Sequence, residues 1–511
     1  MKKILFILSI VLLMGSCDDG FEDINVDPTK PNQVPVTSKL TAAQLFTSGE
    51  RYENWRANLI YQSTMMQHYA TTAGYWSGDK YTWNRGYASS LIDRYYESAV
   101  KSLVDIQAQL EAEGAPEEMK AITRILKVFV FSRLTDLYGD IPYSEAGKAV
   151  TEGILQPKYD PQSEIYADML KELEESAAAL GSGTSGFGSA DLFYAGDQAK
   201  WKKFANSMML RLGFRLIKVD PTASQAWVTK AIAGGVMESN ADIAKVDHTV
   251  GPEGVNQNGI GEVFQADNNQ RMSKTFIDFL QDDPRLTVLG ALPEDTGEDD
   301  DDGNDILRTP EERSDPASQK GLPNGLDLEM LEEDTGEENT LAYTEPNREI
   351  MTRRDSPMFF QTYAEVEFML AEAAVRWGLA GGDPEPHYNA GVRAAMKMYE
   401  LDSPEAAIDD ADIDAYLLAK PFDAANALEQ INTQYWAATY LNEYEAFSNW
   451  RRTGFPVLVP VNYPGNETGG TIPRRLTYSV GDQSNNPDNY AEAVARQGAD
   501  VLTTRVWWDV E

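Results

Sequence analysis

Apolar residues recur three and four positions apart along most of the chain after about residue 37, which is the spacing of one face of an α-helix. Thr37 or Ser38 is suited to cap a first long helix, because its hydroxyl can accept a hydrogen bond from a free backbone N–H of the first turn. The same spacing predicts further helices at residues 88–111, 116–138, 161–180, 198–218, 223–234, 362–378, 385–399 and 424–445. Strand patterns are short and rare, as at residues 456–461. The pattern therefore predicts an all-α, predominantly helical fold.

Residues 361–399 indicate how the predicted helices combine. One helix carries apolar or small residues on one face, and so does the next: Ala364, Phe368, Ala371, Ala374 and Trp377, then Tyr388, Gly391, Ala394 and Ala395. Small residues at these spacings let two antiparallel helices approach closely. The pattern predicts a tetratricopeptide-like helix pair here, whereas outside residues 361–399 the spacing is too irregular to assign such pairs.

Three segments lack the helical pattern. Residues 71–85 are rich in aromatic residues, Gly and Asp, and residues 247–270 are rich in Gly, Asn and Asp. Residues 291–340 carry 18 acidic residues against three basic ones, with few apolar side chains to offset the entropy of ordering. A chain of 511 residues would ordinarily form two or more domains. We interpret residues 291–340 as a long acidic excursion on the surface, which is mobile unless a cation or a partner orders it.

The N-terminus has the form of an export signal. Lys2 and Lys3 precede an apolar run from Ile4 to Met14, which is shorter than the roughly 20 residues of a membrane-spanning helix. We interpret residues 1–16 as a signal peptide. The small residues that follow lead directly into Cys17, which looks like a lipid-attachment cysteine, with residues 17–36 as a tether. The alternative is an ordinary signal peptide in which Cys17 is a spare thiol.

The net charge and the single cysteine limit the kinds of partner and site that this chain can have. The formal net charge is -37, which repels nucleic acid and anionic lipid headgroups, so we expect no nucleic-acid partner. Membrane attachment must then come from acyl chains on Cys17. Because Cys17 is the only cysteine, the chain cannot form an internal disulfide or a cysteine-built metal site.

Candidate chemistry is sparse. The three histidines lie in different segments, so no histidine pair has the spacing of a metal site, and no nucleophile or phosphate-loop motif is present. We expect no catalysis and no cofactor. In the acidic run, an EF-hand centred on Gly303 would need a glutamate where Thr309 stands. Two alternatives stay open there: a solvated charged surface, or a structural calcium site with the candidate ligands Asp300, Asp302 and Asp305.

The aromatic segment at residues 75–87 is the strongest candidate for ligand binding. A sugar presents an apolar C–H face and a rim of hydroxyls, so its site needs flat rings beside amide, carboxylate and guanidinium groups. The candidates are Tyr75, Trp76, Asp79, Tyr81, Trp83, Asn84 and Arg85, with a second wall from the stretch 256–270, represented by Asn256 and Asn268. Trp76 and Trp83 are the first choices for a stacking ring. We also expect at least two of the five aromatic residues in this segment to pack as core. The five are Tyr75, Trp76, Tyr81, Trp83 and Tyr87.

Several motifs carry a family resemblance over nearly the whole chain. They are residues 135–146 (TDLYGDIPYSEA), 158–160 (KYD), 201–207 (WKKFANS), 283–285 (DPR), 450–456 (WRRTGFP) and 472–476 (IPRRL), followed by Trp507 and Trp508. In this order they resemble the SusD/RagB nutrient-binding lipoproteins, and most closely the subgroup that begins with an Asn-Val-Asp-Pro stretch, here Asn25 to Pro28.

The resemblance implies a non-catalytic lipoprotein on the outer membrane, facing the cell exterior. It also implies that residues 37–511 form one helical domain, in which a scaffold of tetratricopeptide-like helix pairs carries long ligand-binding loops. Its implied partner is a SusC-like, TonB-dependent barrel transporter, to which it delivers oligosaccharides. A neutral glycan suits the acidic surface better than a uronate. The alternatives are a peptide-binding member of the same family and, from another class, a tetratricopeptide-type adaptor with no small ligand.

Overall fold

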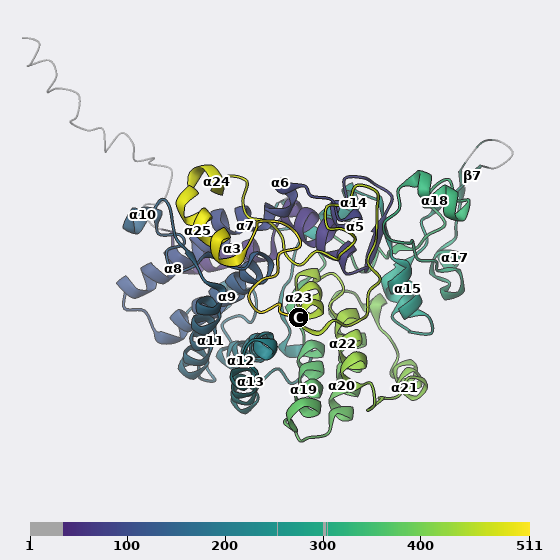
Figure 1. Cartoon of the computed structure of the whole chain (residues 1–511). Helices are drawn as coiled ribbons and strands as arrows, with labels where there is room; N and C mark the ends of the chain where they lie inside the picture. The colour runs from purple at the N-terminus through teal and green to yellow at the C-terminus, as the bar shows by residue number, and fades with distance from the viewer. Residues whose placement is uncertain (1–33, 253, 300–302, 304) are drawn as a thin grey trace, which may run out of the picture.

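The computed structural model describes residues 34–252, 254–299, 303 and 305–511, and its helices pack side by side in the lower part of Figure 1. Their bounds are α9 (Glu117–Tyr138), α11 (Gln162–Ala179), α12 (Gln198–Arg215), α13 (Pro221–Gly234), α19 (Tyr363–Trp377), α20 (Pro384–Lys397), α22 (Ala427–Ala438) and α23 (Glu443–Thr453). These helices form two groups, α9 to α13 and α19 to α23, and within each group successive helices pack on each other. Helix α12 joins the two groups by packing on α19. The predominantly helical fold is confirmed.

The close approach predicted within residues 361–399 is also present. Helices α19 and α20 pack together, and a Cβ atom on Gly391 would stand 2.7 Å from the ring of Phe368. Glycine is therefore required at this crossing, because any larger residue would push the two helices apart.

A second layer of shorter helices lies above these pairs (Figure 1). Its members are α3 (Val36–Ser48), α4 (Arg51–Glu53), the π-helices η1 (Asn54–Ser63) and η2 (Tyr96–Val100), α5 (Ser77–Lys80), α6 (Arg85–Ala88), α7 (Ser90–Tyr95), α8 (Lys101–Ala112), α10 (Ala149–Glu152), α24 (Asp482–Asn485) and α25 (Pro487–Gln497). The predicted first helix begins after Pro35 without a side-chain cap, and it is interrupted at Gly49, whose φ of 82° is unsuited to a helix.

The described strands form five antiparallel pairs. They are β1 (Tyr69–Thr71) with β5 (Gln270–Met272), β2 (Ile141–Pro142) with β3 (Tyr159–Asp160), β4 (Ala244–Val246) with β10 (Met358–Gln361), β6 (Gly290–Ala291) with β9 (Glu345–Pro346), and β7 (Asp295–Asp299) with β8 (Asp305–Leu307). The β1–β5 pair joins the segment after η1 to the segment after α14 (Gly259–Ala266). Residues 456–461 are irregular backbone, so the strand expected there is absent.

Some segments expected to be irregular contain short helices. The segment 247–270 includes α14, because the Asn258 side chain accepts from two backbone N–H groups of the first turn and Ile260, Val263 and Phe264 are buried on one face. The remaining short helices are α15 (Lys274–Leu280), α16 (Leu286–Leu289), α17 (Pro310–Ser314), α18 (Leu328–Thr335) and α21 (Asp410–Ala419), with 3-10 turns η3 (Gly188–Ala190), η4 (Leu216–Lys218), η5 (Asn240–Asp242), η6 (Pro316–Ser318), η7 (Met398–Leu401) and η8 (Pro404–Ala406).

The prediction of one helix over residues 424–445 is wrong. The chain turns between α22 and α23, where Leu441 has a left-handed φ of 71°. The turn is fixed by long-range contacts, since Asn58 accepts a hydrogen bond from the backbone N–H of Glu443 at 3.1 Å. Such contacts leave no periodic signal in the local sequence.

The acidic stretch 291–340 divides into two parts. The β7–β8 hairpin is largely exposed, as expected. The second part packs into a small core with Ala70 and Tyr343, to which it contributes Leu322, Leu326 and Leu331. Leu322 also exchanges backbone hydrogen bonds with Met272 (2.9 Å) and Lys274 (2.8 Å). The expectation that the whole stretch is mobile is therefore corrected for this second part.

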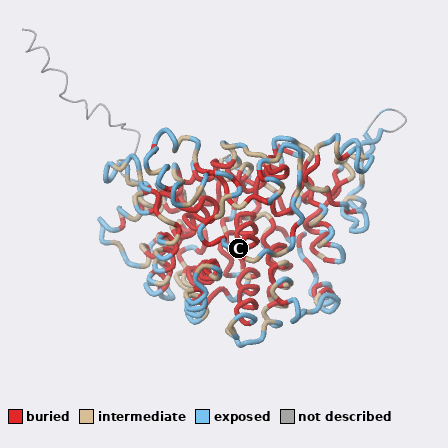
Figure 2. The backbone as a smooth tube through the Cα atoms, viewed as in Figure 1, coloured by how far each residue is buried: buried red, intermediate tan, exposed pale blue. Residues whose placement is uncertain are grey.

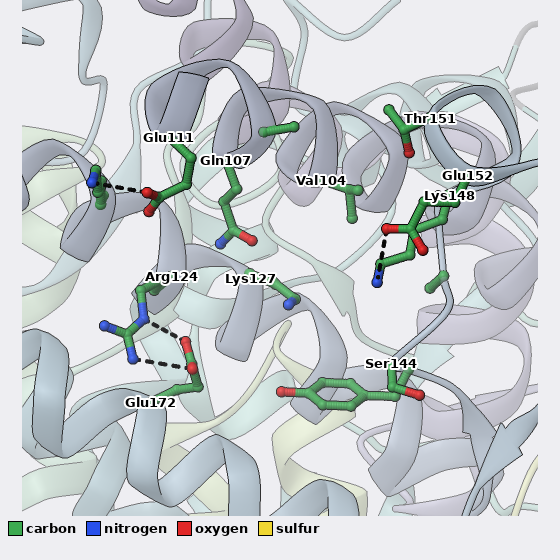
Figure 3. A pocket seen from close by; sticks show the side chains of 14 residues that line it. Val104, Gln107, Glu111, Arg124, Lys127, Ser144, Lys148, Thr151, Glu152 and Glu172 are labelled. Carbon is green, nitrogen blue, oxygen red and sulfur yellow. Dashed lines mark hydrogen bonds and ion pairs between the residues drawn. The ribbon is translucent and has the colours of Figure 1, made fainter. Parts of the chain in front are cut away.

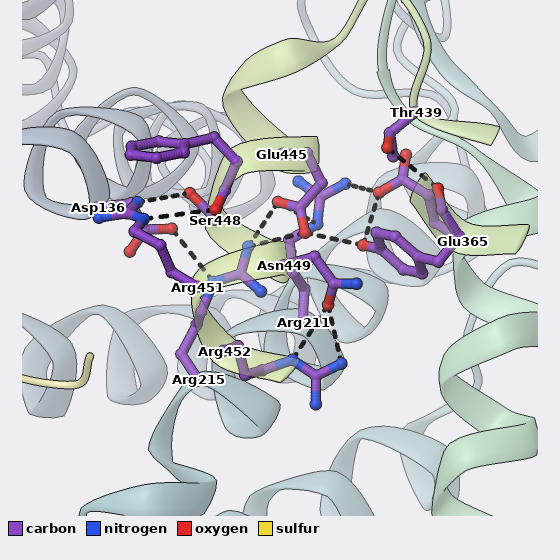
Figure 4. Close-up of polar contacts among 12 residues, drawn as sticks. Asp136, Arg211, Arg215, Glu365, Thr439, Glu445, Ser448, Asn449, Arg451 and Arg452 are labelled. Atoms are coloured by element: carbon purple, nitrogen blue, oxygen red, sulfur yellow. Dashed lines mark hydrogen bonds and ion pairs between the residues drawn. The ribbon is translucent and has the colours of Figure 1, made fainter. Parts of the chain in front are cut away.

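The helix pairs are largely buried (Figure 2), and their interior also contains charged side chains (Figure 4). Arg211 and Arg215 of α12 pair with Glu365 of α19 and Glu445 of α23, respectively. The Tyr435 hydroxyl lies within hydrogen-bond distance of both carboxylates, 3.0 Å from Glu365 and 2.8 Å from Glu445. These contacts fix the register of α12, α19, α22 and α23 relative to one another. No described helix is long and apolar enough to cross a membrane.

Candidate functional site

Aromatic residues from four separate segments meet on the upper layer. Trp55 of η1 lies between Tyr75, in the loop before α5, and Tyr87 of α6, with ring centroids 6.0 Å and 6.4 Å away. Tyr52 of α4 joins them through Arg56, whose guanidinium lies 4.8 Å from the Tyr52 ring centroid and 5.2 Å from that of Tyr87. We call Tyr52, Trp55, Tyr75 and Tyr87 the aromatic cluster.

The cluster presents rings to solvent. Tyr52 is 55% exposed and Tyr75 is 39% exposed, while Trp55 and Tyr87 are half-buried against the core. Helices α4, α5, α6 and α14 all pack against η1, so the backbone that carries the rings is held in place on several sides. Helices α5, α6 and α14 lie at the top of the molecule in Figure 1. Exposed flat rings on a rigid base can stack on the apolar face of a ligand.

One buried carboxylate holds three ring donors. Oδ2 of Asp267 accepts from Trp55 Nε1 at 3.1 Å, from the Tyr75 hydroxyl at 2.7 Å and from Trp76 Nε1 at 3.3 Å. Burial, together with the hydrogen bond to this carboxylate, raises the pKa of Tyr75 to about 12. The phenol is therefore neutral at physiological pH and keeps its proton in the bond to Asp267.

The position of Asp267 follows from the loop between α14 and β5. Its backbone N–H closes the end of α14 by donating to the Val263 carbonyl at 2.8 Å. Its Oδ1 accepts from the backbone N–H of Asn269 at 3.1 Å and from the Asn269 amide at 2.9 Å. The Asn269 amide also donates to the Tyr75 hydroxyl at 2.9 Å. The loop between α14 and β5 and the Tyr75 ring therefore hold each other in position through these hydrogen bonds.

Two arginines add hydrogen-bonding capacity beside the rings. Arg56 lies over Tyr52 and Tyr87, and the Arg51 guanidinium is 5.7 Å from the Trp55 ring centroid. Neither side chain has a carboxylate or carbonyl partner among the described residues, and the Nε atom of each lacks an acceptor. Guanidinium donors next to exposed rings are suited to a ligand that has both an apolar face and hydroxyl groups.

Three of the residues singled out from the sequence are buried instead. Trp76 is fully buried, Asp79 is fully buried, and Tyr81 is 1% exposed, so none presents a surface to a ligand. Asp79 pairs with Lys80 at 3.0 Å and accepts from the Asn324 amide at 2.6 Å. These residues shape the loop that carries Tyr75, which corrects their assignment as ligand contacts and the first choice of Trp76 as a stacking ring.

Trp83, Asn84 and Arg85 lie beside the cluster with different partners. The Trp83 indole N–H donates to the Thr477 hydroxyl at 2.9 Å, and the Arg85 guanidinium lies 5.1 Å from its ring centroid. Trp83 is half-buried, so part of its ring is accessible. Asn84 caps α6 by accepting from the Tyr87 N–H at 3.1 Å, which makes it a positioning residue for that ring.

The two asparagines of the expected second wall differ. Asn268 is exposed in the loop that carries Asp267, and its carbonyl accepts from Arg271 at 2.6 Å. Asn256 is half-buried, and its carbonyl accepts from the Thr249 N–H at 2.9 Å. Only Asn268 lies in a segment that contacts the aromatic cluster.

The remaining candidates concern metal and lipid. Asp305 is exposed on β8, whereas Asp300, Asp302 and Cys17 lie outside the described residues. Within the part of the chain that the structure describes, no three His, Cys, Asp or Glu side chains are grouped so that they could hold a metal ion. Calcium binding in the acidic hairpin and lipidation of Cys17 stay predictions.

Sequence reasoning missed Tyr52, Trp55 and Asp267. Tyr52 and Trp55 are three positions apart on a predicted helix, a spacing that usually marks a buried face. Asp267 lies within the Asn-rich stretch that was expected to form a second wall, but nothing in its local sequence marks it as the anchor of rings from two distant segments. An aromatic residue next to arginine, as in Arg51-Tyr52 and Trp55-Arg56, was the available signal.

Comparison with known proteins decides the family. A family model described as "Starch-binding associating with outer membrane" matches residues 28–479 of the 511. This chain belongs to the SusD-like family. Among curated proteins no sequence matches.

Solved structures of SusD-like and related proteins share the fold. A protein named as chitin-binding is 36% identical, with a TM-score of 0.81, and the match covers 93% of this chain and all of that chain. A SusD-like protein of Bacteroidetes, AC2a, is 27% identical with a TM-score of 0.79, covering 94% of this chain and all of its own. A chitin-binding SusD homolog from Flavobacterium johnsoniae is 24% identical, with a TM-score of 0.76 over 93% of this chain and 99% of that one, and shows the fold alone.

Proposed function

We propose that this SusD-like protein captures a neutral glycan at the aromatic cluster and delivers it to a TonB-dependent transporter of the outer membrane. In this proposal the protein binds its ligand without catalysis and is held at the exterior face of the membrane by lipid on Cys17. The observation that carries the proposal is the exposed Tyr75 ring, held by Asp267 beside Arg51 and Arg56, whose Nε atoms have no acceptor in the described part of the chain.

The chemistry of the cluster favours a sugar over other neutral ligands. The ring of Tyr75 offers an apolar face, while the guanidinium groups of Arg51 and Arg56 offer donors that sugar hydroxyls can accept from. A ligand without hydroxyls would leave those donors unpaired, which costs binding energy.

Chitin oligosaccharides are the first ligand to test. The 36% identical relative is named as a chitin-binding protein, and its match covers the whole of its own chain. Oligomers of N-acetylglucosamine are neutral, so the overall charge of -37 does not oppose their approach. They also carry apolar methyl groups that can pack beside the rings.

Isothermal titration calorimetry of chitin oligosaccharides against the protein tests the proposal. Tyr75→Ala removes an exposed ring, and we expect it to lower affinity by about tenfold to a hundredfold, the usual cost of truncating an aromatic anchor. Tyr75→Phe keeps the ring and removes the hydrogen bond to Asp267, so it should lie between the parent and Tyr75→Ala.

Trp227→Ala is the matched control. Trp227 is a half-buried indole with a lysine at 4.1 Å from its centroid, but it lies on α13, in the lower part of Figure 1 and away from the cluster. It should bind like the parent. Unchanged affinity in a folded Tyr75→Ala protein, or an equal loss in Trp227→Ala, contradicts the assignment of the site.

A further inference from the structure

A cavity of about 380 Å³ lies at the side of the molecule, between α8, α9, α11 and the segment that leads into α10 (Figures 1 and 3). Its volume is in the range of small-molecule sites in proteins. It contains none of the residues of the aromatic cluster, which lies around η1, so its function is a separate question.

The lining of this cavity is unusually basic for a protein with a net charge of -37. It contains four basic side chains, and three of them are paired with carboxylates: Lys120 with Glu111 at 3.0 Å, Arg124 with Glu172 at 2.6 Å, and Lys148 with Glu152 at 3.3 Å. The fourth is Lys127.

Lys127 has no acceptor for its ammonium group. It forms no ion pair or hydrogen bond with another described residue, and its nearest aromatic neighbours are Tyr143 and Phe131, with ring centroids 5.3 Å and 6.0 Å from Nζ. Figure 3 shows the ammonium in the open space between the Arg124–Glu172 pair and Lys148. Burial lowers the pKa of Lys127.

The neighbouring carboxylates of Glu172 and Asp168 attract Lys127 through space, but neither accepts a hydrogen bond from it, because both are bonded to other partners. Glu172 receives two hydrogen bonds from Arg124, at 2.6 Å and 3.0 Å. Asp168 accepts from the Tyr143 hydroxyl at 2.6 Å. Lys148, which is paired with Glu152, also faces this space and lowers the pKa of Lys127 as a like charge.

A second donor points into the same space. The Gln107 side chain descends from α8 toward Lys127, and its Nε2 atom is buried without a hydrogen-bond partner among the described residues. Buried amide donors are nearly always paired in folded proteins. Two donors from different helices, both without an acceptor and both facing one cavity, define a place for an oxygen-rich anion.

We propose that this cavity is a binding site for a small carboxylate, which accepts hydrogen bonds from Lys127 Nζ and Gln107 Nε2. A hydroxylated carboxylate such as a sugar acid fits best, because Thr151 and the carboxylates of Glu111 and Glu152 line the same cavity and can pair with ligand hydroxyls. The site is independent of glycan binding at the aromatic cluster.

Calorimetry of the detergent-solubilised full chain with D-glucuronate tests the proposal, with D-glucose as the uncharged counterpart. We expect glucuronate to bind at this site and glucose not to. Lys127→Met removes the charge and keeps the length of the side chain, and it should lower the glucuronate affinity at least tenfold. Gln107→Met, on a different helix, should lower it by a smaller factor.

Lys202→Met is the control, since Lys202 is also half-buried but lies on α12 and outside the cavity lining. It should bind glucuronate like the parent. Because a bound carboxylate stabilises the charged form of Lys127, binding at alkaline pH should take up protons, so its heat should vary with the ionisation enthalpy of the buffer. This dependence should disappear in Lys127→Met.

Three results would overturn the proposal. They are the absence of glucuronate binding, equal binding by the parent and a folded Lys127→Met protein, and full displacement of glucuronate by equimolar chloride, which would show a counter-ion site only. None of them bears on the aromatic cluster, whose variants are tested with chitin oligosaccharides.

Discussion

Tyr75 and Trp76 are adjacent in the sequence and have opposite surroundings. Tyr75 is 39% exposed, whereas Trp76 is fully buried and reaches Asp267 from below with its indole N–H. Both contact the same carboxylate, so one residue displays a ring and its neighbour supports the loop. The distinction depends on the path of the backbone through this loop, which aromatic density in the sequence does not report.

Replacing Trp76 should therefore affect folding and not ligand recognition directly. We expect Trp76→Ala to lower the free energy of unfolding by about 3–5 kcal/mol, the usual cost of removing a buried indole. Urea unfolding followed by circular dichroism measures this. A Trp76→Ala protein with parental stability would contradict the burial of this ring.

The sequence predicted the region of the candidate site but only part of its membership. Tyr75 and Asn268 were identified from residue type and turn composition, although both segments also contain short helices. Trp55 and Asp267 were missed, because their roles arise from the β1–β5 pairing that brings residues 69–71 beside residues 270–272. Side-chain composition cannot reveal such a pairing when each strand has three residues.

At the level of elements, the helices with strong periodicity were predicted to within a few residues, and the turns between them were not. Helix α9 ends at Tyr138 and Gly139 follows with a φ of 84°, as the local sequence predicts. The break between α22 and α23 depends instead on Asn58, which lies far away in the sequence. The sequence around a helix end therefore predicts that end only where the residue that stops the helix is a neighbour in the sequence.

Helices α19 and α23 are joined by a buried ion pair that should make stability depend on pH. Both carboxylate oxygens of Glu372 accept from Arg452 at 2.7 Å, and Arg376 donates to one of them at 2.6 Å. Burial alone would raise the pKa of Glu372, but the two guanidinium groups outweigh it and lower the pKa to about 2.

The contribution of Glu372 should be complete above its unfolded pKa of about 4.5 and disappear as the pH falls through about 2. A shift of this size corresponds to roughly 3 kcal/mol. Urea unfolding between pH 7 and pH 2 should therefore show a smaller loss of stability in Glu372→Gln than in the parent, from a lower starting value. Glu174→Gln, which changes a half-buried glutamate paired with Lys230 at the surface, should follow the parent curve. Parallel curves for Glu372→Gln and the parent would contradict the role of the Glu372 pair.

The two parts of the acidic stretch should respond differently to change. Removing residues 297–305 of the exposed hairpin should alter the thermal midpoint little, because surface changes of this kind usually cost less than about 0.5 kcal/mol. Leu331→Ala, in the small core with Tyr343, should cost about 2–5 kcal/mol. Differential scanning calorimetry compares them, and a large loss from the hairpin deletion would show that the hairpin supports the fold.

At the scale of the whole molecule, the helical fold was predictable because nearly every helix pair buries a periodic apolar face. The predicted attachment of the protein to the outer membrane depends on Cys17, which lies outside the described residues. We predict that mass spectrometry of the membrane-extracted protein shows an acylated N-terminal cysteine, and that Cys17→Ala releases the protein into the soluble fraction. An unmodified Cys17, or cleavage at another residue, would contradict lipid anchoring.

The hold of Asp267 on three ring donors has a consequence for how such proteins diverge. One ring lies on η1 and two lie in the loop before α5, and all three donate to a single residue in the short loop after α14. Surface loops accept insertions and substitutions more readily than packed helices do. A lineage that turns to a different polysaccharide can therefore reshape its recognition surface through a handful of changes around this carboxylate. The helix pairs, which carry the stability, are then inherited unaltered.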